Sequence, residues 1–181
     1  GLADIERCRF SYMATAWVIT MGTRAVFRSC EFENLRIDAG YVSIASDATI
    51  IDCTYRDVEV AVLSTEQTGR ITMRNCDIQS VEDTSILGRS YGYASITGCN
   101  LAAGERGAVW IGERWEGCGE TRTLDFTDNW WGTADRDSIA SLIRDHLDDE
   151  DRCYIVDFEP FREEVAPAEV INLGDVKSLF R

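Results

Sequence analysis

Five cysteines recur at an almost constant interval, and this period constrains the fold more than any other feature of the chain. The steps are 22, 23, 23 and 23 residues between Cys8, Cys30, Cys53, Cys76 and Cys99. In the next comparable stretch, TLDFTDNWW, Asn129 stands in the cysteine position. A fixed period in this range is typical of a solenoid, in which each repeat buries its apolar face only by stacking on its neighbours. The sequence therefore predicts one stacked coil for each interval.

Two apolar columns accompany the cysteines. Three residues before the cysteine position stand Ile5, Phe27, Ile50, Met73, Ile96 and Phe126, and two residues after it stand Phe10, Phe32, Tyr55, Ile78, Leu101 and Trp131. The alternation around them has the period of a strand, a further short apolar stretch lies between successive cysteines, and no 3.6-residue pattern is repeated. We therefore predict an all-β parallel helix of about six coils, each with three short strands, in which both columns face the interior.

The cysteine column itself is predicted to be structural, with small buried side chains at the bend between two strands. Disulfides within the column are disfavoured, because strand neighbours lie about 4.8 Å apart while a disulfide needs Cβ atoms about 3.8 Å apart. A metal tetrad needs converging ligands, which a linear column does not supply. Cys118 and Cys153 stand outside the column, and the sequence leaves open whether they pair or stay free.

The chain changes character after Asn129. Ile139, Leu142, Ile143, His146 and Leu147 follow the spacing of one helical face, which predicts a helix over about 136–147 with Asp135 or Asp137 as its N-cap. YIVDF at 154–158 predicts a final edge strand. Because an uncovered coil exposes backbone groups and core, we expect the helix to cap the solenoid. The expected domain is 1–161, and the tail 162–181 either runs back along the solenoid or docks another subunit.

The coil pattern resembles the right-handed parallel β-helix, or pectate-lyase-like, superfamily of polysaccharide lyases, hydrolases, epimerases and phage tailspikes. In many members asparagine fills the bend column, whereas here cysteine fills it five times and Asn129 once. NWWGTAD, the spaced IASLI, DDED and VDFEPF resemble a C-terminal segment of bacterial and archaeal members. The resemblance implies the fold and a carbohydrate-associated role.

Polar residues recur one coil apart beside the strands. Their carboxylates are expected about 5 Å from each other, the separation found in retaining glycosidases, although any β-solenoid with acidic loops has this spacing. The resemblance implies an arginine base beside acids that bind calcium, so the candidate catalytic residues are Asp57, Glu82, Asp83 and Arg89, with Arg106 as the alternative base. The candidate substrate-binding residues are Glu59, Glu105, Arg106, Trp110, Glu113 and Trp115. Alternatively, the loop that carries Trp110 and Trp115 folds over the neighbouring wall and buries its own tryptophan.

An acidic run follows the expected helix, although negative charge near a helix C-terminus opposes the helix dipole. One interpretation is a Ca²⁺ site, without the spacing of an EF-hand, formed by Asp145, Asp148, Asp149 and Asp151. The other is a solvated turn that pairs with Arg144 and Arg152. No other cofactor is expected, and His146, the only histidine, is expected to belong to the cap.

The charge balance narrows the range of partners. The 18 Lys and Arg against 32 Asp and Glu give a net charge of -14, which would repel the phosphates of nucleic acid. No apolar run is long enough to span a membrane, and GLADIERCRF lacks the order of a signal peptide, although a chain without an initiating Met leaves open a removed signal or further coils.

We predict a protein that binds, and in the stronger hypothesis cleaves, an extended polysaccharide, which would place it outside the cell or at its surface. The alternative is a non-catalytic stalk, surface or particle subunit that associates through its coil edge or its tail.

Overall fold

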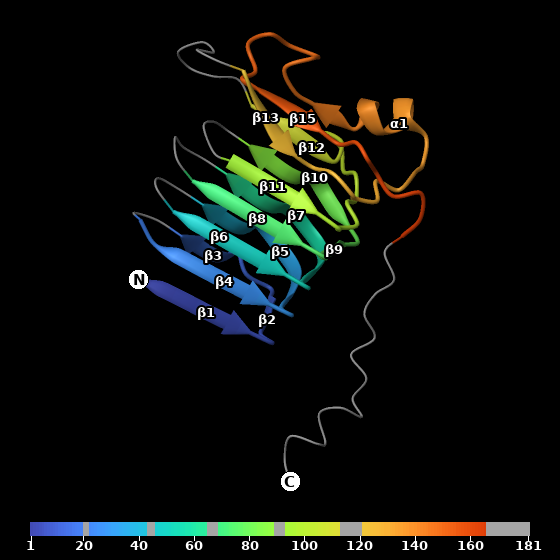
Figure 1. Cartoon of the computed structure of the whole chain (residues 1–181). Coiled ribbons are helices and arrows are strands. Elements are labelled where there is room, and N and C mark those ends of the chain that lie inside the picture. The colour runs from blue at the N-terminus through green and yellow to red at the C-terminus, as the bar shows by residue number, and fades with distance from the viewer. Residues whose placement is uncertain (20–21, 43–45, 65–68, 89–92, 113–120, 166–181) are drawn as a thin grey trace.

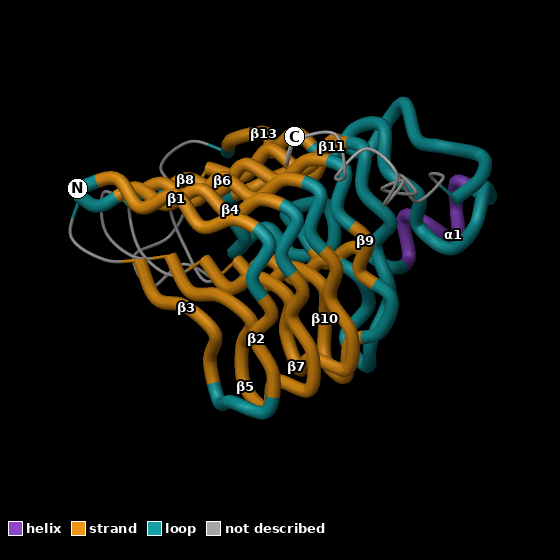
Figure 2. Tube along the Cα trace, turned by 90° about the horizontal axis from the view of Figure 1, so that it is seen from below, coloured by secondary structure: helices purple, strands orange, loops and turns teal. Residues whose placement is uncertain are grey.

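The computed structural model shows parallel strands wound into a single coil, with one short helix at the C-terminal end (Figure 1). It describes residues 1–19, 22–42, 46–64, 69–88, 93–112 and 121–165. The strands form two parallel sheets that face each other across the interior (Figure 2). The prediction of an all-β parallel solenoid is therefore confirmed.

The first sheet has seven strands, one from each successive passage of the chain, in the order β1-β4-β6-β8-β11-β13-β15. Its strands are β1 (Leu2–Glu6), β4 (Arg24–Arg28), β6 (Asp47–Ile51), β8 (Arg70–Arg74), β11 (Tyr93–Thr97), β13 (Arg122–Asp125) and β15 (Tyr154–Asp157). The last strand falls where the sequence predicts an edge strand, and it pairs with β13.

The second sheet has eight strands, and its two longest bend so that each supplies two of the three expected strand segments. Its strands are β2 (Arg9–Ser11), β3 (Thr15–Ile19), β5 (Glu31–Val42), β7 (Thr54–Ser64), β9 (Asp77–Ile78), β10 (Val81–Gly88), β12 (Val109–Ile111) and β14 (Ile143–Arg144). The strict 22–23-residue interval is kept between Cys8 and Cys99 only. The solenoid therefore has about four regular turns, rather than about six, before the spacing changes.

Both predicted apolar columns lie inside, in register from coil to coil. Ile5 pairs with Phe27, Phe27 with Ile50, and Ile50 with Met73. In the second column the rings of Phe10, Phe32 and Tyr55 stack, with centroids 5.1 and 4.7 Å apart. Only the members from the first coil are partly exposed, because no coil covers them on one side.

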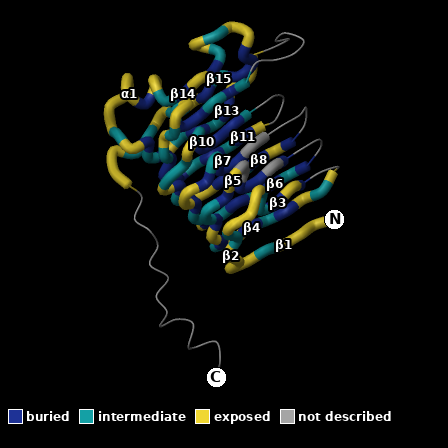
Figure 3. The backbone as a smooth tube through the Cα atoms, turned by 180° about the vertical axis from the view of Figure 1, so that it is seen from behind, coloured by how far each residue is buried: buried dark blue, intermediate teal, exposed yellow. Residues whose placement is uncertain are grey.

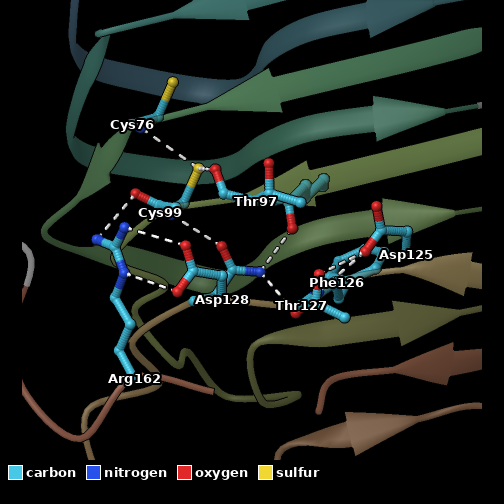
Figure 4. A network of polar contacts seen from close by, with 11 residues as sticks. Cys76, Thr97, Cys99, Asp125, Phe126, Thr127, Asp128 and Arg162 are labelled. Carbon is cyan, nitrogen blue, oxygen red and sulfur yellow. Dashed lines mark hydrogen bonds and ion pairs between the residues drawn. The ribbon is translucent and has the colours of Figure 1, made fainter. Parts of the chain in front are cut away.

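The cysteine column joins adjacent coils by weak hydrogen bonds. The backbone N–H of Cys30 donates to Sγ of Cys53 at 3.4 Å. The N–H of Cys76 likewise donates to Sγ of Cys99 at 3.3 Å, as Figure 4 shows. Asn129 continues the column with stronger bonds, since its Oδ1 accepts from the N–H of Cys99 at 2.8 Å. Its Nδ2 donates to the carbonyls of Ile96 and Phe126 at 2.6 and 2.8 Å. The cysteines therefore occupy the position and the bonding role of an asparagine ladder.

The residue just before each column position sets the bend between the two sheets. This residue has a positive φ in every coil, between 50 and 70°, at Arg7, Ser29, Asp52, Asn75, Gly98 and Asp128. The left-handed conformation is uncommon for residues other than glycine, although Asn and Asp adopt it more readily. A stack of identical bends keeps successive coils in register.

The C-terminal cap differs from the prediction in one respect. The helix α1 covers Arg136–Ser141 instead of about 136–147, with Asp135 as its N-cap. After Leu142 the chain joins the second sheet as β14, which pairs with β12, so that Ile143 lies in a strand. Leu147 is 77% exposed and does not belong to the apolar face of the cap.

A buried carboxylate explains why the helix ends early. Asp145 accepts hydrogen bonds from the N–H groups of Leu147 at 2.8 Å and Val156 at 2.7 Å, which fixes a turn where the helix was expected to continue. His146 lies in this turn, as expected for a cap residue, with its N–H donating to the carbonyl of Tyr154. Nearby, Cys153 is disulfide-bonded, whereas Cys118 lies outside the described residues.

The two ends of the solenoid differ in burial. Strand β1 is largely exposed, whereas the middle strands of the first sheet alternate between buried and outward-facing residues (Figure 3). At the C-terminal end, Ile139 of α1 and Ile143 of β14 are buried in the main core. The core is thus covered at one end only within the part of the chain that the structure describes.

Candidate functional site

A bend in the second sheet brings most of the nominated polar residues onto neighbouring coils. Val58 of β7 pairs with Val81 of β10, and Val60 pairs with Thr84, so Glu59 lies opposite two residues, Glu82 and Asp83. The next coil follows the same path, because the N–H groups of Glu105 and Arg106 donate to the carbonyls of Glu82 and Asp83 at 2.9 and 3.0 Å. We call Asp57, Glu59, Glu82, Asp83, Glu105 and Arg106 the outer bend.

Glycine makes this close approach possible. A Cβ atom on Gly104 would lie 2.5 Å from the carbonyl oxygen of Asp83, so a larger residue would push the turn at 104–107 away from β10. The N–H of Gly104 donates to the carbonyl of Gly107, and the reverse bond is also made. This tight turn places Glu105 and Arg106 beside the preceding coil.

Two of the nominated carboxylates are already engaged by neighbouring side chains. Asp83 forms an ion pair with Arg106 at 2.9 Å, and the Asp83 side chain is only 15% exposed. The hydroxyl of Ser80 donates to Asp57 at 2.8 Å and accepts from the N–H of that aspartate. Glu59, Glu82 and Glu105 have no side-chain partner within the described residues, so these three carboxylates are available to a ligand.

Trp110 lies beside the outer bend on β12, next to Leu87 on one side and Arg144 on the other. Its ring packs against a small apolar cluster formed by Val60 and Leu87, outside the main core. The guanidinium carbons of Arg106 and Arg152 lie 5.3 and 4.8 Å from the ring centroid. Trp110 is therefore held in place by cation–π contacts while remaining partly exposed.

The sequence does not predict the contact between Arg152 and Trp110. Arg152 comes from the turn that follows β14, is buried, and donates to the carbonyl of Ile111. It also pairs with Asp149 at 3.5 Å. The position of Arg152 in the acidic run predicts an ion pair, and the pair with Asp149 is present. The sequence of this segment does not indicate that the turn packs against β12.

Three nominated residues, Arg89, Glu113 and Trp115, lie outside the described residues. Their place relative to the outer bend stays a prediction.

The acidic residues nominated for Ca²⁺ form hydrogen bonds and ion pairs within the protein. Both carboxylate oxygens of Asp145 accept backbone N–H bonds, while Asp148 and Asp149 pair with Arg144 and Arg152 at 4.0 and 3.5 Å. The carboxylate of Asp149 also accepts the N–H of Asp151. Across the described ranges no group of three or more His, Cys, Asp or Glu side chains is arranged to hold a metal ion. These contacts favour the alternative of a turn paired with arginines.

Burial controls the chemistry of the interior thiols. Desolvation raises the pKa of Cys76 well above its ordinary value and also raises that of Cys30. The same cause raises the pKa of Tyr55, whose hydroxyl is buried without a hydrogen-bond partner in the described chain. Cys30, Cys76 and Tyr55 are therefore neutral in the folded protein, whereas the hydrogen bond with Cys76 lowers the pKa of Cys53.

Comparison with known proteins agrees with the architecture. A family model described as a right handed beta helix region matches residues 1–129. No curated protein and no solved structure matches the chain. Among the described residues no helix is long and apolar enough to cross a membrane.

Proposed function

Since the chain belongs to the right handed beta helix family, we propose that it is a rigid scaffold that binds an extended glycan along the outer bend. The observation that carries this proposal is the alignment of Glu59, Glu82 and Glu105 on three successive coils, with Trp110 beside them. Unpaired carboxylates accept hydrogen bonds from sugar hydroxyls, and a partly exposed aromatic ring offers an apolar face to a sugar ring. A linear polymer would contact several coils at once.

Binding is better supported than cleavage. Asp83 and Asp57, the acids nominated for catalysis together with Glu82, are engaged by Arg106 and Ser80. A glycosidase needs one free carboxylate as nucleophile or base and a second as acid, facing the same sugar, and of the three acids nominated for catalysis only Glu82 is free within the described chain. We therefore propose glycan binding as the primary function and treat turnover as a separate outcome of the same experiment.

The experiment compares retention of the protein in native gels cast with individual neutral and acidic polysaccharides. The variant Glu82→Gln/Glu105→Gln should lose affinity about tenfold, because two hydrogen bonds to charged groups are weakened. The matched control Glu163→Gln/Glu164→Gln changes the net charge by the same amount at exposed positions near the end of the described chain. Equal retention of wild type and the outer-bend variant on every retained polysaccharide would contradict the proposal.

The same samples test for turnover. Unsaturated or reducing-end products that disappear in Asp57→Ala, Glu82→Ala or Asp83→Ala, without a lower melting temperature, would extend the proposal to a lyase or hydrolase. Absence of products together with retention would leave a binding protein.

A second function is favoured by the first coil, which has a neighbouring coil on one side only in the described chain. Strand β1 lies at the edge of the first sheet, and exposed apolar side chains gather in this coil, including Tyr12 at 83% and Val18 at 59%. An unpaired strand edge next to apolar surface is suited to association with another chain. No retention on any glycan, combined with concentration-dependent association in light scattering, would favour this assembly role instead.

A further inference from the structure

Three neighbouring strands of the first sheet carry four arginines on their outer face. On β4, β6 and β8 the residues that alternate with buried ones point outward and lie in register: Arg24, Val26 and Arg28, then Asp47, Thr49 and Ile51, then Arg70, Thr72 and Arg74. Four arginines and one aspartate give this patch a charge of +3, and the neighbouring strand β1 adds Asp4 and Glu6 on the same face, which leaves +1 on these four strands of a chain with a net charge of -14. We call these nine residues the arginine face.

The arginines at one edge of this face are not neutralised. Arg70 and Arg74 form no ion pair with any residue that the structure describes. Arg24 pairs with Asp47 at 3.0 Å and Arg28 pairs with Asp4 at 3.7 Å, but all four side chains are more than a third exposed, so water screens both pairs. An incoming anion can therefore compete for all four guanidinium groups.

Hydroxyl and aromatic groups accompany the charges. The hydroxyls of Thr49 and Thr72 lie in adjacent strands between the arginines and have no hydrogen-bond partner within the described ranges. Tyr93, on the next strand, is 48% exposed, and the guanidinium carbon of Arg70 lies 5.3 Å from its ring centroid. Cations, free hydroxyls and an exposed ring thus lie on four neighbouring parallel strands, β4, β6, β8 and β11.

The spacing of the arginines suits a linear polymer. Arg70 and Arg74 are four residues apart on one strand, which corresponds to about 13 Å, and Arg24 and Arg70 are two strands apart, about 10 Å. Nucleic acid carries one charge for about every 1.7 Å of duplex, a density that the acidic remainder of this chain would repel. A polysaccharide with one acidic group on each sugar or disaccharide is less densely charged and also offers hydroxyls.

We propose that the arginine face binds an acidic polysaccharide, with its carboxylate or sulfate groups on Arg24, Arg28, Arg70 and Arg74 and its sugar hydroxyls on Thr49 and Thr72. This surface lies on the first sheet, whereas the outer bend lies on the second. The inference therefore goes beyond the proposed function and does not depend on it.

Isothermal titration with polygalacturonate as the carboxylated probe, and with dextran as the neutral one, tests the proposal at about 20 and about 200 mM salt, since attraction between exposed charges weakens as salt screens it. Wild type should bind polygalacturonate, more weakly at the higher salt, and should not bind dextran through this face. Arg70→Gln/Arg74→Gln should lower the affinity about tenfold. The control Arg136→Glu, in the cap, changes the net charge by the same -2 and should retain wild-type affinity.

The outcomes separate the two binding surfaces. Loss of polygalacturonate binding in Glu82→Gln/Glu105→Gln but not in Arg70→Gln/Arg74→Gln would contradict binding at the arginine face and support binding at the outer bend. The opposite pattern would support the arginine face alone. Equal losses in Arg136→Glu and in the double arginine variant would show that only total charge matters, and no binding of polygalacturonate at the lower salt would end the proposal.

Discussion

Single side chains in the bend column connect one coil to the next. Sulfur accepts hydrogen bonds weakly, and the N–H groups of Cys30 and Cys76 reach it at 3.4 and 3.3 Å. Asn129 makes three bonds to backbone groups of two coils. The column is therefore held most firmly at the point where the regular coils meet the cap.

Removing the Asn129 amide should be costly. Asn129→Ala leaves the N–H of Cys99 and the carbonyls of Ile96 and Phe126 without this partner inside the protein, at about 1–3 kcal/mol for each unsatisfied group. We expect the free energy of unfolding in urea to fall by at least about 3 kcal/mol. Asn129→Cys, which places the residue of the other column positions there, should cost less than alanine. An equal loss in both variants would show that the column acts by packing alone.

At the scale of elements, one arginine fastens the cap to the solenoid. The Arg152 side chain is 9% exposed and joins the turn after β14 to Ile111 and Trp110 of β12. A planar guanidinium can lie over a ring and donate to a carbonyl at the same time, which an ammonium group cannot reproduce. The cap is therefore attached by a specific contact as well as by apolar burial.

Substitution of Arg152 should loosen this attachment. Arg152→Ala should lower the free energy of unfolding by about 2–3 kcal/mol, because a buried hydrogen bond and the ring contact are lost. Arg152→Lys should recover only part of it. Arg136→Ala, which removes an exposed pair with Glu159, should cost at most about 1 kcal/mol. Urea unfolding followed by tryptophan fluorescence measures all three, and an Arg152→Ala value no larger than that of Arg136→Ala would refute the attachment.

The strands and interior columns could be predicted because the 23-residue period repeats the same local pattern in each coil. The end of α1 could not, because it depends on a hydrogen bond from the N–H of Val156 to Asp145, and the sequence predicts the strand of Val156 but not this contact. For the candidate site, coil spacing predicted that Glu59 and Glu82 lie on neighbouring coils. Coil spacing did not predict that Arg106 pairs with Asp83 or that Arg152 lies over Trp110. Arginine side chains are long enough to reach several neighbouring residues, and the repeat does not specify which of these they contact.

At the scale of the whole molecule, the two ends differ in stability. A solenoid is stabilised by contacts between neighbouring coils, so a coil with one neighbour opens more easily than a coil with two. The first coil has an exposed thiol at Cys8, and the thiols of Cys30, Cys53, Cys76 and Cys99 lie progressively nearer the cap. The rate at which each thiol reacts therefore measures how readily its own coil opens.

Thiol labelling should follow this order. At neutral pH without reductant, iodoacetamide should modify Cys8 in the native protein at once, then Cys30, and Cys76 and Cys99 last, with peptide mass spectrometry assigning each site. Burial raises the pKa of Cys76, which keeps its thiol uncharged and slow to react until the coil opens. A single common rate for the four buried thiols would mean that the solenoid unfolds only as a whole.

The identical bends and columns have a consequence for the length of the molecule. A copy of residues 54–76 inserted after Cys76 would bring its own bend, thiol and pair of interior side chains, and every chain position beyond it would meet an equivalent neighbour. Each added 23-residue repeat would therefore lengthen the solenoid by one strand spacing, about 4.8 Å. Steps of 22 residues from Cys8 to Cys30 and of 30 residues from Cys99 to Asn129 keep the same column, so a coil can change length between its paired strand positions without losing register.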